Sequence, residues 1–245
     1  MGEPIVRAQQ VELPRDPETE AWRAAHARPH AAPVALVHSL LRRFASDYDV
    51  DGWLGTHPMH VLGTASWRAL LGRERAAGTL LDIGAGRGDV TATLAPLFDR
   101  VVATETSAPM VRRLRARGFE AHRLDLASEQ LPAASRFDAV ALLHVLDRCA
   151  RPRSLLRAAV GAMADDAVAI VACPLPATPH VDVGGHTVDP DEPLGIEGED
   201  FDTALSSLAS FLESEGLRIE RWARTTYLAR GGQALDDAIV IARRR

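Results

Sequence analysis

The stretch Thr79-Leu-Leu-Asp-Ile-Gly-Ala-Gly-Arg-Gly-Asp-Val90 decides the fold of this chain. An apolar run with an acid near its end is followed by three alternating glycines and then by a segment with helical character. Glycine lets a ligand approach the backbone closely, and the start of a helix offers free N–H groups. Two ligand classes use a strand, a glycine-rich turn and a helix in this order: dinucleotides and S-adenosylmethionine.

Three features of this turn favour S-adenosylmethionine. The spacing Gly84-x-Gly86-x-Gly88 departs from the G-x-G-x-x-G pattern of dinucleotide folds. Asp82 would repel a pyrophosphate but attract an ammonium group. Glu105 ends the next expected strand, where a carboxylate can accept hydrogen bonds from both ribose hydroxyls. The alternative interpretation is that the glycines serve only a tight turn.

A third acid, Asp125, follows the third expected strand. It can accept from the amino group of adenine, or it can simply cap a turn. The predicted cofactor site therefore comprises Asp82, Gly84, Ala85, Gly86, Glu105, Thr106, Asp125 and Leu143.

From residue 79 onward, strand-like and helix-like segments alternate, which predicts an α/β fold with a mostly parallel sheet. We expect seven strands, the last two forming an antiparallel C-terminal hairpin. The segment 174–199 is predicted to be a long loop, and long loops are often functional. The expected strands are 80–83, 100–104, 120–124, 138–143, 167–173, 217–227 and 234–242, and the expected helices are 90–97, 109–117, 153–163 and 200–215.

The first third of the chain lacks this alternation. It predicts a loose arm over 1–16, a turn-rich segment over 49–63, and helices over 17–29, 34–47 and 64–71. In the second helix, Val34, Val37, Leu40, Leu41 and Phe44 share one face. We therefore divide the chain into an arm with a helical cap, 1–74, and a cofactor-binding domain, 75–245.

The composition excludes several classes of function. With a formal net charge of -5, the chain has no broad basic surface for nucleic acid. No apolar run approaches the length that spans a membrane. The N-terminal residues lack the apolar core of a signal peptide, so we expect a cytoplasmic protein. The two cysteines, Cys149 and Cys173, are expected to be buried thiols.

No metal site is expected. His26 and His30 have suitable spacing, but Pro29 between them should end the helix that would align them. His57 and His60 look too isolated to form a site.

A narrower pattern occurs further along, in Leu142-Leu-His-Val-Leu-Asp-Arg-Cys-Ala-Arg-Pro152. This segment resembles the N-L-L-D-R-C-x-x-P signature of the DREV family, the protein-histidine N-pros-methyltransferases. The fold pattern resembles that of the Rossmann-like class I methyltransferases. Other short segments also match the DREV family, in the same order along the chain, over about residues 49–243. They include Leu81–Gly86, Ala103–Glu105, Leu175-Pro176, Gly184-Gly185, Tyr227-Leu228 and Leu235–Ala238.

The resemblance implies methyl transfer from S-adenosylmethionine to the N-pros nitrogen of a histidine in a peptide or protein, with S-adenosylhomocysteine as the product. Asp147 is the candidate that orients the acceptor imidazole; it could otherwise cap a helix or pair with Arg148. His144 can contact the acceptor, donate to the cofactor or fill the strand's end. Tyr227 can bound the acceptor pocket or merely pack.

Two departures from the family pattern concern the acceptor. The family has Asn where this chain has His144, and a longer tyrosine-bearing segment is replaced by 229–233. The loop 174–193, with His180 and His186, is expected to shape a peptide groove or to lie on the surface. A small-molecule N- or O-methyltransferase is therefore the alternative, and a non-catalytic binding module or a dehydrogenase fits less well. The sequence leaves the oligomeric state open.

Overall fold

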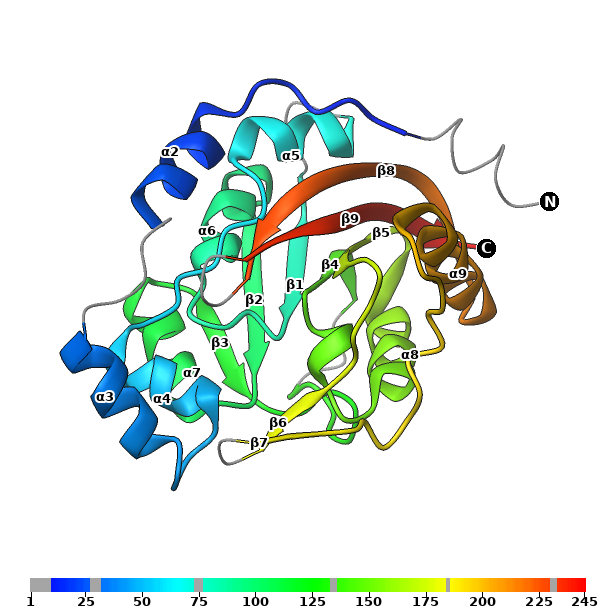
Figure 1. Ribbon diagram of the computed structural model, residues 1–245. Coiled ribbons are helices and arrows are strands. Elements are labelled where there is room, and N and C mark those ends of the chain that lie inside the picture. Colours follow the sequence, from blue (N-terminus) through cyan, green and yellow to red (C-terminus); the bar gives the residue numbers. More distant parts are fainter. Residues whose placement is uncertain (1–9, 27–31, 73–76, 133–135, 184–185, 230–232) are drawn as a thin grey trace.

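The computed structural model describes residues 10–26, 32–72, 77–132, 136–183, 186–229 and 233–245 (Figure 1). Its helices are α2 (Pro17–His26), α3 (Ala32–Leu41), α4 (Asp47–Leu54), α5 (Thr64–Leu71), α6 (Asp89–Leu94), η1 (Ala95–Leu97), α7 (Ala108–Ala116), η2 (Leu146–Arg148), α8 (Pro152–Ala162) and α9 (Phe201–Ser214). Its strands are β1 (Thr79–Ile83), β2 (Arg100–Glu105), β3 (Glu120–Arg123), β4 (Phe137–Leu143), β5 (Met163–Pro174), β6 (Val181–Val183), β7 (His186–Val188), β8 (Leu217–Leu228) and β9 (Ala234–Arg244).

Seven strands form one sheet in the order β3-β2-β1-β4-β5-β9-β8. The first five are parallel to one another, whereas β9 is antiparallel to both β5 and β8. The predicted α/β fold with an antiparallel C-terminal hairpin is thus confirmed. Since β1 and β4 are neighbours but distant in sequence, the order reverses between them, and ligands bind at such switch points at the carboxyl ends of strands.

Two apolar cores lie on opposite faces of the sheet because the central strands are buried on both sides. On one face, Leu81 and Val140 pack with α8 and α9. On the other face, Leu80 and Ala139 pack with α5 and α6, around the fully buried Trp67. A smaller cluster joins α7 to β2 and β3 on this second face. The sheet is therefore the rigid platform that carries the loops at its edge.

The N-terminal residues are more ordered than the sequence indicates. The prediction of a loose arm is wrong for residues 10–16, because the Val11 N–H donates to the Trp222 carbonyl at 2.7 Å and Asp16 accepts from Gly63 and Ser66. Residues 1–9 of that arm, and His30, lie outside the described residues. α5 forms where the sequence predicts it.

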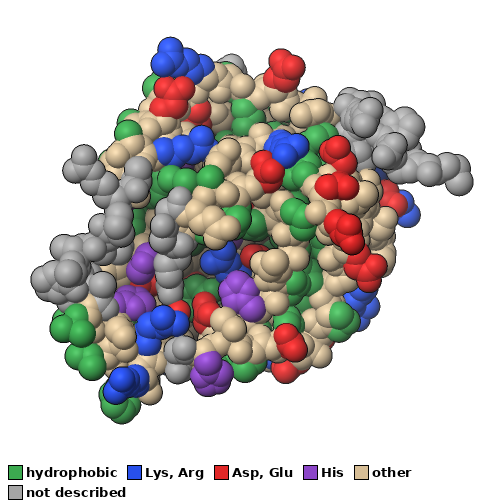
Figure 2. Space-filling view, viewed as in Figure 1, with side chains coloured by type: hydrophobic (Ala, Val, Ile, Leu, Met, Phe, Trp, Pro, Cys, Tyr) green, Lys and Arg blue, Asp and Glu red, His purple; other side chains and the backbone are tan. Residues whose placement is uncertain are grey.

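Two further predictions for this region are wrong. The expected helix over 34–47 ends at Leu41, and a separate helix, α4, occupies part of the stretch that reads as turns. Ser46 begins α4 by accepting from the Asp49 N–H, and Gly55 ends it in a left-handed conformation. The expected apolar face is also not buried, since Phe44 is 90% exposed and Leu40 is 51% exposed. Figure 2 shows hydrophobic side chains at the lower left, where α3 lies in Figure 1.

The expected long loop after β5 contains a short antiparallel pair, β6 and β7. Its flanks are attached to the segment that follows β4, because the His180 N–H donates to the Asp147 carbonyl and the Glu192 N–H to that of Ala150.

Among the residues described, none of the helices has the length and apolar character that crossing a bilayer requires.

Candidate active site

The glycine turn after β1 lies against the segment that follows β4. Gly84 has φ of 69°, and a Cβ built on it would meet the Val145 side chain at 2.8 Å. Gly86 has φ of 56°, but a Cβ there meets nothing within 4 Å. Gly84 is therefore required for close packing, whereas Gly86 leaves space beside the backbone. Such a space beside the backbone of the turn fits the predicted cofactor.

Glu105, at the end of β2, is held by backbone N–H groups. Its Oε1 accepts from Thr106 at 2.7 Å and from Ser107 at 3.0 Å, and its Oε2 accepts from Gly86 at 3.0 Å. Since a carboxylate has about four acceptor positions, few remain for a ligand. The predicted bidentate contact with ribose therefore requires Glu105 to release the Gly86 N–H.

Asp82 is buried at the end of β1 and accepts from the Thr91 hydroxyl at 2.6 Å. Burial raises its pKa from 3.8 to about 7, and the nearby charge of Glu105 adds to this, while the Thr91 hydrogen bond opposes it. An ammonium group placed beside it would favour the ionised carboxylate. Asp82 and Glu105 therefore form an acidic pair next to the glycine turn, as a sulfonium amino acid requires.

The remaining predicted cofactor residues have different surroundings. Asp125 accepts from the Ala127 N–H at 3.0 Å and pairs with Arg151 at 2.9 Å, which is the turn-capping arrangement. Leu143 is buried among the side chains of the apolar core. The Ala85 N–H donates to the Thr104 carbonyl at 3.2 Å.

Asp147 lies in η2, just beyond β4, and is buried. Its Oδ2 is 3.3 Å from the Arg148 Nε, whereas its Oδ1 has no hydrogen-bond partner among the described residues. Burial lowers the pKa of Arg148, but the charge and hydrogen bond of Asp147, together with Tyr227 and Tyr48, hold the pKa above its usual value. The Oδ1 atom is thus a buried acceptor that a ligand N–H can satisfy.

His144 follows β4 directly and pairs with Asp237 of β9. The His144 Nε2 lies 2.8 Å from the Asp237 Oδ2, and both side chains are 0% exposed. The carboxylate makes Nε2 the protonated nitrogen, and Nδ1 has no partner among the residues described. His144 has φ of 53°, a left-handed conformation in which Asn and His are enriched. The Asn of the family pattern and the His144 of this chain can therefore both adopt this positive φ.

Both tyrosines of the chain, Tyr48 and Tyr227, lie at this group. The Tyr227 ring centroid is 4.1 Å from that of His144, and the Arg148 guanidinium lies over the same ring. Burial raises the pKa of Tyr227.

The sequence analysis missed Tyr48, which comes from α4. Burial raises the pKa of Tyr48, the charge of Arg148 opposes this rise, and the charges of Asp182, Asp147 and Glu105 add to it. Tyr48 is therefore within electrostatic range of both Asp147 and Glu105. The scarcity of tyrosine was a possible signal, but only the fold places a residue of α4 beside β4.

An open hollow of about 500 Å³ lies at the segment that carries β6 and β7, and the His180 N–H of this segment donates to the Asp147 carbonyl at 3.0 Å. Thr178, Pro179 and His180 line it on one side, and Thr187, Val188 and Asp189 on the other. Residues of the 174–193 loop thus line a hollow, and its use as a peptide groove stays a prediction. The expectation that both cysteines are buried holds fully only for Cys173, since Cys149 is half-buried.

The histidines outside this group also differ from expectation. His60 shares a hydrogen bond of 2.7 Å with Thr19. The expectation that His57 is isolated is wrong, because its Nδ1 lies 2.7 Å from Asp51.

Comparison with known proteins finds similarity in sequence and in fold. A curated relative, the ubiquinone biosynthesis O-methyltransferase of Xanthomonas axonopodis pv. citri (strain 306), is 29% identical over 143 residues, 53% of this chain and 58% of that protein. The chain thus spans less than two thirds of that relative's length.

Two solved structures share the fold. The N-methyltransferase NodS from Bradyrhizobium japonicum WM9, in complex with S-adenosylhomocysteine, matches with a TM-score of 0.52 at 16% identity, covering 73% of this chain and 83% of that one. The 1,6-didemethyltoxoflavin-N1-methyltransferase from Burkholderia thailandensis, also with S-adenosylhomocysteine, matches with a TM-score of 0.53 at 19% identity, covering 89% and 92%.

The model of the DREV methyltransferase family matches residues 19–244, which is most of the chain. This match and the shared fold confirm the prediction of an S-adenosylmethionine-dependent methyltransferase. The chain belongs to the DREV methyltransferase family.

Proposed function

We propose that this enzyme methylates the N-pros nitrogen of a histidine side chain in a peptide or protein. The observation that carries the proposal is Asp147: a buried carboxylate with one oxygen open, beside two tyrosines and next to the glycine turn. The resemblance of 142–152 to the family signature supports the same acceptor. The cytoplasmic location and the division of the chain into a cap, 1–74, and a cofactor-binding domain, 75–245, stay predictions.

The bound cofactor supplies an electrophilic methyl group on a sulfonium sulfur. A neutral imidazole needs no prior deprotonation, since one ring nitrogen carries a lone pair. That lone pair forms the new N–C bond as the methyl–sulfur bond breaks, and the electrons of the broken bond remain on sulfur. What the protein must do is orient the ring and choose the nitrogen.

Asp147 meets both needs. Its open Oδ1 accepts the N–H of the far ring nitrogen, which directs the pros nitrogen toward the methyl group. Its charge then stabilises the imidazolium product until the far nitrogen releases its proton. Tyr48 and Tyr227 bound the ring, and the hollow beside His180 receives the flanking peptide.

The test is incubation of the purified chain with S-adenosylmethionine and histidine-containing peptides. Mass spectrometry with standards for the two methylhistidine isomers should find N-pros-methylhistidine. Asp147→Asn should abolish the product while S-adenosylhomocysteine still binds. Methylation at the other ring nitrogen, or equal turnover by the variant, would contradict the proposed role of Asp147.

A second candidate, a small-molecule N- or O-methyltransferase, is favoured by the His144–Asp237 pair. A histidine held by a buried carboxylate can remove a proton from a hydroxyl or amine acceptor as the methyl group is transferred. The names of the two relatives above, an O- and an N1-methyltransferase, favour the same chemistry.

His144→Asn separates the two candidates, because Asn restores the family residue and tolerates the positive φ. A histidine methyltransferase should keep its turnover on peptides. An enzyme that depends on a histidine base should lose turnover by about 10²-fold or more on its small acceptor.

A further inference from the structure

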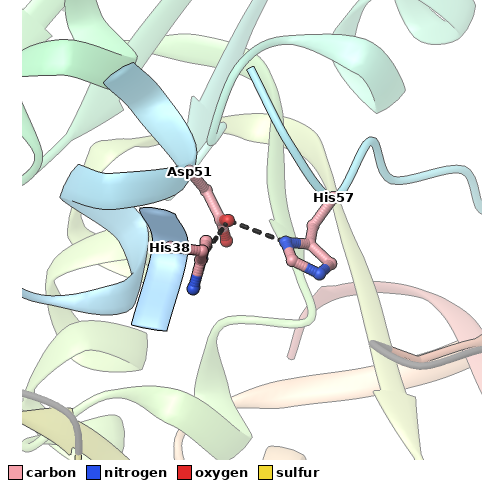
Figure 3. A group of neighbouring side chains, drawn as sticks. All are labelled: His38, Asp51 and His57. Carbon is pink, nitrogen blue, oxygen red and sulfur yellow. Dashed lines mark hydrogen bonds and ion pairs between the residues drawn. The ribbon is translucent and has the colours of Figure 1, made fainter. Parts of the chain in front are cut away.

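Three potential metal ligands converge on the helical cap, apart from Asp147 and the glycine turn. His38 of α3, Asp51 of α4 and His57 of the following loop point toward one another (Figure 3). The His38 Nε2 is 2.8 Å from the Asp51 Oδ1, and the His57 Nδ1 is 2.7 Å from the same oxygen. The three ligand atoms all lie within 4.8 Å of one another.

The local backbone brings these side chains together. The Gly55 N–H donates to the Asp51 carbonyl at 2.8 Å and ends α4 in a left-handed conformation. The chain thereby turns back over the last turn of the helix. His57 is itself held at φ of 50°, which is uncommon for a residue with a side chain and often marks a functional position.

The cluster is shielded from solvent but reachable from one side. The Asp51 side chain is 4% exposed and that of His38 is 10% exposed, whereas His57 is 26% exposed. The two imidazole rings meet nearly edge to face, at an interplanar angle of 76°. The Thr56 hydroxyl donates to the Asp51 Oδ1 at 2.6 Å.

Two imidazoles and one carboxylate are a ligand set that zinc uses. Tetrahedral coordination at about 2.0–2.1 Å places neighbouring ligand atoms about 3.3 Å apart. The two nitrogen–oxygen separations must therefore open by about half an ångström, which small side-chain rotations allow. Binding needs only the neutral tautomers whose lone pairs lie on the His38 Nε2 and the His57 Nδ1.

We propose that His38, Asp51 and His57 bind one zinc ion, with the Thr56 hydroxyl orienting the Asp51 carboxylate by its hydrogen bond to Oδ1. Orientation of a ligating carboxylate by such a hydrogen bond is usual in zinc sites. The site joins α3, α4 and the loop after α4, and the two helices expose apolar side chains such as Leu40 and Trp53. Zinc binding therefore stabilises the cap.

The site also adjoins the glycine turn. Arg87 of that turn donates to the Gly55 carbonyl at 2.6 Å and to the Thr56 carbonyl at 3.4 Å. The Ser107 hydroxyl, beside Glu105, donates to the Asp49 carboxylate of α4 at 2.7 Å. A zinc ion that fixes α4 and its loop thus fixes groups that contact the cofactor-binding segments. The proposal does not depend on the identity of the methyl acceptor.

The experiment uses the full chain, purified without a metal-affinity tag and treated with a chelator. Titration with Zn²⁺ against a competing chromophoric chelator should give one tight site per chain. Bound Co²⁺ should show the ligand-field absorption of a tetrahedral site. Zn²⁺ should also raise the unfolding temperature by an amount that depends on its concentration.

The decisive variant is His57→Asn, because Asn tolerates the positive φ but removes the imidazole. It should weaken Zn²⁺ binding at least about tenfold, and Thr56→Val should weaken it by a similar factor. The matched control is His122→Ala, which removes a histidine of β3 that pairs with the half-exposed Glu120. This variant should leave Zn²⁺ binding unchanged. Far-UV circular dichroism checks that each variant is folded.

Two results would overturn the proposal. One is a wild-type chain whose affinity for Zn²⁺ is no higher than that of the His57→Asn variant. The other is equal loss of binding in His122→Ala, which would indicate nonspecific binding to surface histidines.

Discussion

The His144 Nε2 lies 2.8 Å from the Asp237 Oδ2, although 93 residues separate them in the chain. This pair joins the end of β4 to β9, the strand that is antiparallel to its neighbours. The His144 ring centroid is 4.1 Å from that of Tyr227, and Asp147 follows in η2, so the pair links the proposed acceptor site to the sheet. Because both side chains are buried, each depends on the other for its hydrogen bond.

Asp237→Ala should lower the free energy of unfolding by about 3–5 kcal/mol, since it leaves His144 buried without a partner. His144→Asn should cost only about 1 kcal/mol, because its amide can still donate to Asp237. Urea unfolding of both variants checks this difference. Equal destabilisation would show that the pair contributes only packing.

Asp147→Asn should lower kcat on the methyl acceptor by roughly 10²–10⁴-fold, as loss of an orienting carboxylate does. Its affinity for S-adenosylhomocysteine should stay within about twofold of wild type, because Asp147 makes none of the hydrogen bonds that hold the glycine turn and Glu105. Steady-state kinetics and calorimetry measure the two effects. Asp202→Asn, an exposed acid in the first turn of α9, is the control and should change neither. Parallel loss of binding and turnover would instead assign Asp147 to the cofactor site.

Asp82 should make cofactor binding depend on pH. Because its pKa is about 7, the carboxylate is largely neutral at lower pH and must ionise to pair with an ammonium group. The affinity for S-adenosylhomocysteine should therefore rise about tenfold between about pH 6 and pH 8. Asp82→Asn should bind more weakly and should remove most of this dependence. Calorimetry at several pH values would show an unchanged slope if Asp82 is not the responsible group.

The same group should affect stability in the opposite direction. The folded-state pKa of about 7 is above the reference value of 3.8, so the folded chain binds the extra proton between these values. The contribution of Asp82 to stability is thus fully present below about pH 4 and is lost as the pH rises through about 7. Asp82→Asn should gain stability relative to wild type at about pH 8 in urea unfolding. A constant difference between the two proteins from about pH 5 to pH 8 would contradict a raised pKa.

Tyr48→Phe should raise the KM for the acceptor about tenfold, which corresponds to one hydrogen bond to a charged or polar partner. The affinity for S-adenosylhomocysteine should change little. Trp53→Phe, a half-exposed aromatic residue of the same helix, is the matched control. If the control has the same effect, α4 has been disturbed as a whole and Tyr48 has no specific role.

Glu105→Gln should weaken S-adenosylhomocysteine binding at least about tenfold, because the amide cannot accept from Gly86, Thr106 and Ser107 at once and carries no charge. Calorimetric titration tests this, with Glu213→Gln, an exposed acid of α9, as the control. Unchanged affinity would remove Glu105 from the cofactor site.

The sequence by itself determined the α/β core. In β1 and β4 the buried runs and the turns that end them are local properties, so the existence of these strands and of the glycine turn followed from the pattern. The order of the strands across the sheet came from the structure. The segment 142–152 also determined the family, which residues 19–244 then confirmed. Its Asp147 was found because a motif is a contiguous property of the chain.

The tertiary structure alone decided the rest, since it depends on contacts between distant segments. Periodicity merged α3 with the start of α4 because a helix break at Ser46 depends on a cap that reads equally well as part of a turn. Three features bring together elements that are far apart in the sequence or separated by a turn. They are the place of Tyr48 near Asp147, the pairing of His144 with Asp237, and the meeting of His38 with His57. Their side chains carry no local signal, because their chemistry arises only when packing removes water and fixes the neighbours of each group.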